Sequence, residues 1–343
     1  MFPHTKYTLA KMTGIPWFVN WSNRDRLLVL TYHGIYDGPY QMDRLPDTFV
    51  HVDDLTRQLR AIKQRYRVID PDELLTTLEA GTSLPPNAAL ITFDDGYESF
   101  YRLAAPVLDS LGVRALVFIP THYIEQHKPF WFDVAWLFIR QSPTDDLIWL
   151  MDTLGVECRN INRSVYSALL IDKMKRMLPE ARGEIMDNMK HIMSGESEDY
   201  PLNKLFYPIK NEQMKELADR GATFGGHTHT HTILTSMPDS LAEREILENK
   251  DRLEDLLSRP CHFFAYPNGG PNDFNGNHKT MLKRLGYKAA FSLTQKRSLI
   301  HEDAMDISRI HVAPEDTVTS MLFHCTGTMS VVGRLWRHGK IDE

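Results

Sequence analysis

Two short segments of the sequence concentrate side chains that bind metals or move protons. In the first, Gly225 and Gly226 are followed by His227-Thr-His229-Thr-His231, which places three histidines within five residues. Imidazole is a common ligand of Zn²⁺ and similar metals, and dense histidine tracts are a cue for metal binding. His227 and His231 are the expected ligand pair, and His229 is able to replace one of them if the loop is extended.

The second segment, Thr92-Phe93-Asp94-Asp95-Gly96, contains two adjacent carboxylates. Like charges placed side by side oppose each other's ionisation, so the presence of two adjacent carboxylates calls for an explanation. A metal on one carboxylate and proton transfer by the other would supply that explanation. Two histidines and one carboxylate also leave coordination positions open, as a catalytic metal requires. The competing interpretation is a plain turn, because Asp-Gly is common turn chemistry.

The polar segments follow short apolar runs, and these runs alternate with helical patterns. Alternating strands and helices predict parallel β-α-β units and an α/β class. Catalytic groups of such sheets gather at the carboxyl ends of the strands, so His33, Asp94, the histidine segment and Pro267–Gly270 are expected on one face, as in an enzyme. Strands are predicted at 26–32, 67–69, 88–93, 115–119, 222–226, 262–266 and 289–293, and helices at 53–66, 71–80, 103–111, 211–220, 241–257 and 279–285.

Residues 125–205 break this alternation and contain mainly helical patterns, at 135–140, 166–177 and 181–193. The chain is therefore predicted to have an N-terminal extension at 1–25 and one large domain at 26–343, interrupted by a helical insertion at about 125–205. Trp131, Phe132 and Trp136 lie at helical spacing in the insertion. That spacing favours core packing over a sugar-stacking wall.

Composition limits the partners and the compartment. The 343 residues carry a net charge of −6, which argues against nucleic acid as a partner. Three scattered cysteines fit a reducing compartment, and Cys261 is expected to be a small buried hydrophobe. The N-terminal residues lack the pattern of a secretory signal, so a cytoplasmic location is expected.

Two aromatic segments have the composition of membrane-surface segments. Through them the protein would make a peripheral contact with the inner face of the membrane. One contains Trp17, Phe18 and Trp21, and the other spans Arg334 to Lys340. Aromatic residues beside basic ones are typical of the interfacial region. We nevertheless expect the first three to cap the core, since strong anchors normally need a longer amphipathic helix.

The two chemical segments together resemble a known family. ITFDDG at 91–96, followed by the His-Thr-x-x-His pattern at 227–231, is similar to the first two motifs of the polysaccharide deacetylase family, the NodB-homology enzymes of carbohydrate esterase family 4. The resemblance covers about residues 26–124 and 206–315. Further matching segments are LTYHGI at 30–35, FAYPNG at 264–269, GYKAAFSL at 286–293 and SRIHV at 308–312.

The resemblance implies a fold and an assignment of roles. The fold would be a distorted (β/α) barrel of the NodB-homology type carrying the helical insertion. Asp95, His227 and His231 would hold one divalent metal ion, most simply Zn²⁺, with Co²⁺, Ni²⁺ or Mn²⁺ as alternatives. The metal would polarise a water molecule and the acyl carbonyl. Asp94 would act as the base, and His311 as the acid that protonates the leaving group.

The sequence also departs from the family pattern. Ala265 stands where many members have an arginine that orients the base, so Asp94 needs another partner, for which His33 and Tyr97 are the candidates. The final motif has Arg309-Ile310-His311 in place of Leu-x-His. A backbone N–H near Asn268 would complete the oxyanion site. The predicted substrate-binding residues are His33, Tyr97, Tyr266, Pro267 and Asn268.

The predicted reaction is therefore removal of an acetyl group, N-acetyl by preference, from an acetylated sugar, glycan or glycoconjugate. A cytoplasmic member would meet nucleotide-linked or lipid-linked sugars, or glycan before its export. Two alternatives stay open at this point. One is a hydrolase of the same fold acting on another C–N bond, such as a formamide or a ureide. The other is a weakly active, glycan-binding member, motivated by the missing arginine.

Overall fold

The structure, a computed structural model, describes residues 15–39, 45–157, 162–194 and 204–327. Its centre is a nearly closed barrel of parallel strands in the order β10-β9-β8-β7-β6-β5-β1-β11, with β4 beside β5. The barrel fold predicted from the family resemblance is confirmed. The strands are β1 (Leu28–Tyr32), β4 (Arg67–Val68), β5 (Ala88–Phe93), β6 (Ala115–Ile119), β7 (Thr223–Gly226), β8 (Phe263–Ala265), β9 (Ala289–Ser292), β10 (Ile307–Ser308) and β11 (Ile310–His311).

The segment at 307–311 brings the two ends of the sheet together. β10 pairs with β9 at one end and β11 pairs with β1 at the other, while only Arg309 separates β10 from β11. No strand is predicted here from the sequence, because two-residue strands leave no periodic pattern. This closure sets Arg309 between β10 and β11, where the two ends of the sheet come together.

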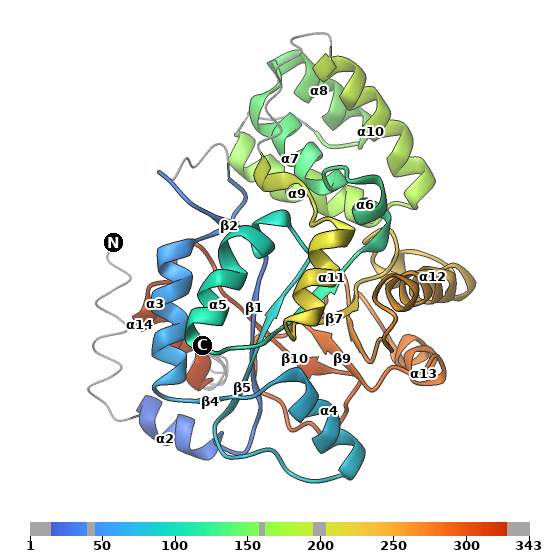
Figure 1. Cartoon of the computed structure of the whole chain (residues 1–343). Helices are drawn as coiled ribbons and strands as arrows, with labels where there is room; N and C mark the ends of the chain where they lie inside the picture. Colours follow the sequence, from blue (N-terminus) through green and yellow to red (C-terminus); the bar gives the residue numbers. More distant parts are fainter. Residues whose placement is uncertain (1–14, 40–44, 158–161, 195–203, 328–343) are drawn as a thin grey trace, which may run out of the picture.

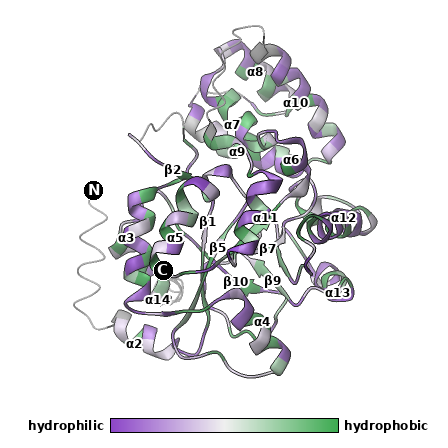
Figure 2. Cartoon of the chain, viewed as in Figure 1, coloured by the Kyte–Doolittle hydropathy of each residue, from purple (hydrophilic) through white to green (hydrophobic). Residues whose placement is uncertain are grey.

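Helices cover the outside of the barrel (Figure 1). Hydrophilic residues lie on the outer surfaces of these helices, most clearly on α12, while the strands inside are hydrophobic (Figure 2). The covering helices are α2 (Ile15–Ser22), α3 (Val52–Lys63), α4 (Pro71–Ala80), α5 (Ala105–Leu111), α11 (Asn211–Asp219), α12 (Asp239–Leu257), α13 (Gly276–Arg284) and α14 (Val318–Thr326). A π-helical turn, η1 (Phe100–Ala104), precedes α5. The helix predicted at 103–111 therefore begins at Phe100, and its first part is π-helical instead of α-helical. A short pair, β2 (Ile35–Tyr36) and β3 (Val50–His51), and the turn η3 (Leu234–Ser236) complete this part.

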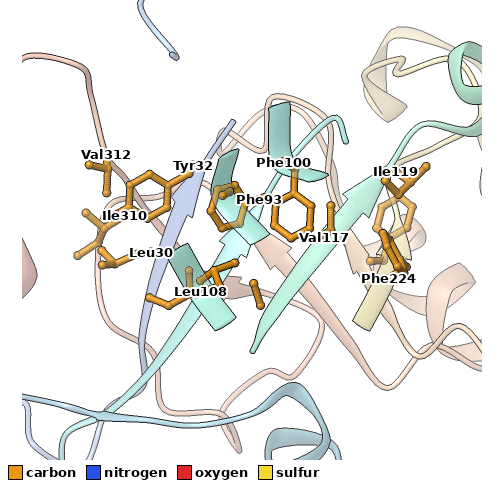
Figure 3. Close-up of a cluster of buried hydrophobic side chains, with 14 of the residues drawn as sticks. Leu30, Tyr32, Phe93, Phe100, Leu108, Val117, Ile119, Phe224, Ile310 and Val312 are labelled. Carbon is orange, nitrogen blue, oxygen red and sulfur yellow. The ribbon is translucent and has the colours of Figure 1, made fainter. Parts of the chain in front are cut away.

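Alternation along each strand divides the core into two clusters. In β5, Leu90 belongs to the cluster inside the barrel, whereas Ile91 and Phe93 face outward against the helices. Figure 3 shows part of the outer cluster, with Phe93 beside Phe100 of η1 and close to Tyr32 of β1. Because both faces of each strand are buried, the strands appear in the sequence as continuous apolar runs.

The helical segment lies in the connection between β6 and β7. It comprises α6 (Thr121–Gln126), α7 (Trp131–Gln141), α8 (Thr144–Thr153), α9 (Arg163–Lys175), α10 (Pro179–Ser194) and the turn η2 (Lys204–Phe206). These helices gather at one end of the barrel (Figure 1, green) and have a hydrophobic core of their own. Trp131 and Trp136 are buried, as predicted, whereas Phe132 is partly buried and its ring lies 4.8 Å from that of His231.

The aromatic residues near the start do not cap the core, contrary to our expectation. Trp17, Phe18 and Trp21 are 74%, 60% and 50% exposed, while Val19 faces inward. Helix α2 has only two turns, so one face packs on α14 and the rest meets solvent. Arg334 to Lys340 falls outside the described residues. Within the part of the chain that the structure describes, no helix is long and apolar enough to cross a membrane.

Candidate active site

The strand geometry of β5 aims Asp94 into the barrel. Leu90 faces the interior, and the two-residue period of the strand carries Asp94 to the same side. Asp95 then takes a left-handed conformation with φ 70°, and Gly96 follows with φ 70°. At Gly96 an added Cβ would lie 2.3 Å from Ile119 Cδ1. Asp95 and Gly96 therefore form the turn that was the competing interpretation of this segment. The same turn directs the Asp95 carboxylate toward the histidines.

The two glycines before the histidines are needed for close packing. A Cβ on Gly225 would lie 2.8 Å from the ring of Phe118, and one on Gly226 would lie 2.5 Å from Asn249 Oδ1. The buried Asn249 amide holds the loop, because its oxygen accepts from the His227 N–H at 3.1 Å. Its nitrogen donates to Ile119 O at 2.8 Å and to Thr228 O at 2.7 Å. Side-chain packing and one buried amide thus fix the start of the histidine loop.

Asp95, His227 and His231 form a buried cluster whose ligand atoms all lie within 4.8 Å of one another. Asp95 Oδ1 is 3.7 Å from His227 Nε2 and 3.3 Å from His231 Nε2. His227 Nδ1 lies 2.7 Å from Ala265 O, a bond that leaves Nε2 free to bind a metal. His229 points away, because its ring bonds Thr121 Oγ1 at 2.9 Å. The structure therefore selects His227 and His231 from the three histidines.

The donor set fits a divalent metal ion. Asp95 Oδ1 is buried and has no hydrogen-bond partner among the described residues. Burial and the neighbouring charge of Asp94 raise the pKa of Asp95 well above its usual value, so the ionised carboxylate needs a cation. Burial lowers the pKa values of His227 and His231, which keeps both imidazoles in the neutral, metal-binding form. Two nitrogens and one oxygen are ligands that Zn²⁺ accepts, with further positions open.

The main partner of Asp94 is Arg309, which was not among the predicted candidates; of those two, His33 lies 3.9 Å from Asp94 Oδ2, whereas Tyr97 bonds elsewhere. The guanidinium donates to both carboxylate oxygens, at 2.5 and 2.8 Å, and its side chain is 1% exposed. Arg309 also donates to Thr31 Oγ1 at 3.2 Å and lies over the ring of Phe118 at 5.3 Å. Burial raises the pKa of Asp94, but Arg309, His227 and His33 outweigh it and hold that pKa at about 2. Position 265 is alanine, and the arginine that contacts Asp94 comes from between β10 and β11.

His33 and His311 flank the same carboxylate. His33 Nε2 lies 3.9 Å from Asp94 Oδ2, and the two imidazole rings are 5.3 Å apart. Burial lowers the pKa of His33 to about 3, with only partial compensation from Asp94. Burial also lowers the pKa of His311. His33 therefore lies beside Asp94 and His311 lies beside His33, and burial favours the neutral form of both.

Two of the predicted substrate-binding residues are packed away from the Asp95–His227–His231 cluster. Tyr97 is 1% exposed and donates to Asp133 Oδ2 at 2.8 Å, so it neither contacts Asp94 nor offers a surface to a substrate. Tyr266 faces the outer core, where its ring stacks on Phe274 at 3.9 Å and its hydroxyl donates to Met305 O at 2.9 Å. In each case the strand or turn period places the aromatic ring behind the site.

The loop after β8 does reach the site. Pro267 is buried and its carbonyl accepts from Gly269 N–H at 2.7 Å, which forms a tight turn. Asn268 occupies the left-handed region with φ 63°, and its side-chain oxygen accepts from Lys175 Nζ at 3.0 Å. Lys175 is the last residue of α9, so the helical insertion contributes to the site.

Three important residues are absent from the sequence-based predictions. The sequence offered one indication of Arg309, because this arginine stands where the final motif of the family usually has leucine. Asn249 and Lys175 lie within ordinary helical patterns and gave no signal. Their roles arise from contacts 22 and 93 residues away along the chain.

Comparison with known proteins identifies the relationship. A family-wide profile described as polysaccharide deacetylase matches residues 81–290. A search of curated proteins finds no match. Among solved structures, the deacetylase PplD of Streptococcus pyogenes is 18% identical with a TM-score of 0.58, over 87% of this chain and 96% of that chain.

Two further solved structures have the same fold. IcaB from Ammonifex degensii is 19% identical with a TM-score of 0.52, over 88% of this chain and 97% of that chain. A de-N-acetylase from Aggregatibacter actinomycetemcomitans is 14% identical with a TM-score of 0.57, over 88% and 100%. At these identities the structural matches establish the barrel fold, and the profile establishes the family. The chain belongs to the polysaccharide deacetylase family.

Proposed function

We propose that this protein is a metal-dependent hydrolase that removes acetyl groups, N-acetyl by preference, from an acetylated sugar polymer or glycoconjugate. The observation that carries the proposal is the buried Asp95–His227–His231 cluster beside the Asp94–Arg309 ion pair. Membership of the polysaccharide deacetylase family supports the substrate class. The similarity to a structure described as a de-N-acetylase favours the N-acetyl substrate.

We assign the metal site to Asp95, His227 and His231. A divalent ion bound there, Zn²⁺ by preference with Co²⁺, Ni²⁺ or Mn²⁺ as alternatives, would supply the positive charge that activates water and polarises the acyl carbonyl. The chain's own contribution is to hold three ligands in their metal-binding forms. The bond from His227 to Ala265 O supports this role by fixing the orientation of one ring.

Asp94 is the proposed general base. Its low pKa keeps it ionised, and the two bonds from Arg309 fix the orientation of the carboxylate. A fixed, ionised carboxylate is ready to accept a proton from an attacking water molecule. Arg309 acts through Asp94, so we regard it as a positioning residue.

His311 is the proposed proton donor to the leaving group. The water oxygen adds to the acyl carbon and its proton passes to Asp94. Neutral His311 receives this proton from Asp94 and gives it to the amine nitrogen as the C–N bond breaks, which restores both residues. The 5.3 Å separation of the His33 and His311 rings, with Asp94 beside both, supports a shared proton path. His33 lines this path in its neutral form.

Acetate release provides the test. The metal-loaded protein is incubated with N-acetylated and O-acetylated sugar polymers, and free acetate is measured. We expect release by the wild type and a loss of at least about 100-fold in Asp94→Asn. Asp37→Asn, at an exposed position, serves as the control and keeps full activity. Full activity of Asp94→Asn would refute the mechanism.

The released acid also separates the alternatives. Formate or another acid in place of acetate would favour a same-fold hydrolase of a different C–N bond. The weakly active alternative loses its motivation, because Arg309 supplies the partner that Asp94 seemed to lack. The cytoplasmic location and the peripheral membrane contact stay predictions, which cell fractionation and vesicle cosedimentation would check.

A further inference from the structure

The helical insertion places one cation beside the proposed metal site. Lys175, at the end of α9, is partly buried and donates to Asn268 Oδ1 at 3.0 Å. Asn268 lies three residues after Ala265, whose carbonyl oxygen is 2.7 Å from His227 Nδ1. The ring of Phe132, from the same helical insertion, lies 4.8 Å from that of His231. The insertion and the loop that holds the Lys175 ammonium therefore both border the proposed metal ligands.

A rigid loop fixes the partner of Lys175. Asn268 has φ 63°, and its side-chain nitrogen donates to Asp273 Oδ2 at 2.6 Å. The same carboxylate oxygen accepts from the Gly270 N–H at 2.8 Å. With its nitrogen committed to Asp273, the Asn268 amide must direct its oxygen to Lys175. The ammonium is thereby held in place while two of its three hydrogens remain available.

Lys175 lacks a carboxylate of its own once the metal ligands are in use. The acids that act on its charge are Asp95, Asp172 and Asp273. Asp172 and Asp273 both lie close to the Arg176 guanidinium, at 3.3 and 3.6 Å. When Asp95 serves a divalent ion, its charge no longer balances Lys175. A partly buried ammonium in that position requires an anion.

The reaction creates an anion at this place. Addition of water to an acyl carbon moves negative charge onto the acyl oxygen, and hydrolysis leaves a carboxylate product. We propose that Lys175 binds the acyl oxygen of the substrate, stabilising the negative charge that develops there and then the acetate product. This inference rests on the proposed function and adds a residue from outside the shared motifs. The helical insertion would then complete the active site.

Acetate binding tests the proposal without turnover. The full chain is loaded with Zn²⁺, and acetate is titrated at pH 7 by calorimetry. Lys175→Met is expected to weaken acetate binding about 10- to 100-fold, as loss of a charged hydrogen bond does. Lys175→Arg retains the charge and is expected to stay within about threefold of wild type. Lys190→Met removes an exposed lysine of the same insertion and serves as the matched control.

Metal affinity distinguishes an electrostatic role from a structural one. Removing a cation beside the metal ligands leaves Zn²⁺ affinity unchanged or raises it, whereas a loss of structure would weaken it. On an N-acetylated substrate, Lys175→Met is expected to lower kcat with little change in KM, because the charge develops in the transition state. The conservative Lys175→Arg variant keeps the comparison interpretable if Lys175→Met unfolds.

Two results would overturn the proposal. One is wild-type acetate affinity in Lys175→Met. The other is a defect limited to polymers that carry anionic groups, with acetate binding intact, which would assign the lysine to a charged substituent of the sugar. If the wild type releases no acetate from any substrate, the proposed function fails, while the acetate titration still decides the role of Lys175.

Discussion

Replacing Arg309 by methionine removes the only guanidinium that contacts Asp94 among the described residues, and leaves a buried carboxylate behind. Both side chains are at most 5% exposed, and the lost contacts include two bonds to Asp94 and one to Thr31. Methionine has a similar length and is apolar, so the variant tests the charge and the hydrogen bonds more than the packing.

The expected cost in stability follows from the burial of the pair. Removing one partner of a buried ion pair typically costs about 3–5 kcal/mol, because the remaining charge is left uncompensated. Asp94 has a depressed pKa in the folded state, so the pair contributes its full stability above the usual value of 3.8. That contribution is lost as the pH falls toward about 2. At pH 7 the whole effect should be present.

The double variant Arg309→Met/Asp94→Asn provides the internal control. It removes both charges, so its free energy of unfolding is expected to exceed that of Arg309→Met, with a coupling energy of about 3 kcal/mol at most. Arg309→Lys keeps the charge but loses the two-pronged geometry, so it should fall between the wild type and the methionine variant. Urea denaturation at pH 7 measures these differences.

Activity gives the second measurement. Without Arg309 the pKa of Asp94 is expected to rise, because burial then acts with less opposition. The acidic limb of the pH–activity profile should move to higher pH, and kcat/KM should fall at least about 100-fold. A methionine variant within about 0.5 kcal/mol of wild-type stability and with an unshifted profile would show that the ion pair has neither role.

Three further predictions concern other parts of the site. Asp95→Asn should weaken Zn²⁺ binding at least about 100-fold, measured as metal retained after gel filtration; full retention would exclude Asp95 as a ligand. His33 is held neutral by a pKa of about 3, so its contribution to stability is present above pH 6.5 and is lost as the pH falls toward 3. In metal-free protein, His33→Gln should therefore flatten the fall in unfolding free energy by up to about 1.4 kcal/mol per pH unit, and an unchanged slope would contradict this assignment. Gly226→Ala should destabilise the chain by about 1–3 kcal/mol through its clash with Asn249, whereas Gly276→Ala, which has open space, should not; equal effects in thermal unfolding would argue against the packing explanation.

The fold was largely predictable because its strands are buried on both faces. The strands β5 and β6 have the predicted bounds, since continuous apolar segments between turn signals identify such strands. The strands β10 and β11 were not predicted, because two residues each carry no period. The π-helical turn before α5 escaped for a similar reason, as it differs from an α-helix in hydrogen bonding and not in composition.

The sequence by itself determined the ligand types and their order. Adjacent aspartates and a histidine tract signal a metal site because few other roles tolerate so many polar groups after apolar strands. Only the tertiary structure chose His227 and His231 over His229, since the choice depends on the left-handed residues Thr228 and His231 and on the contact of His229 with Thr121. Neighbouring residues in the sequence indicate which metal-binding side chains are present. Which of those side chains come together depends on contacts with residues that are distant in the sequence.

The same distinction explains Arg309 and Lys175. Barrel closure at 307–311 brings Arg309 to Asp94 across 215 residues of sequence, and the helical insertion brings Lys175 to Asn268 across 93. No spacing rule connects such pairs, because their contact is set by strand order and helix packing. The sequence specified which polar groups the barrel end carries, and the three-dimensional path of the chain decided that Arg309 lies against Asp94 and Lys175 against Asn268.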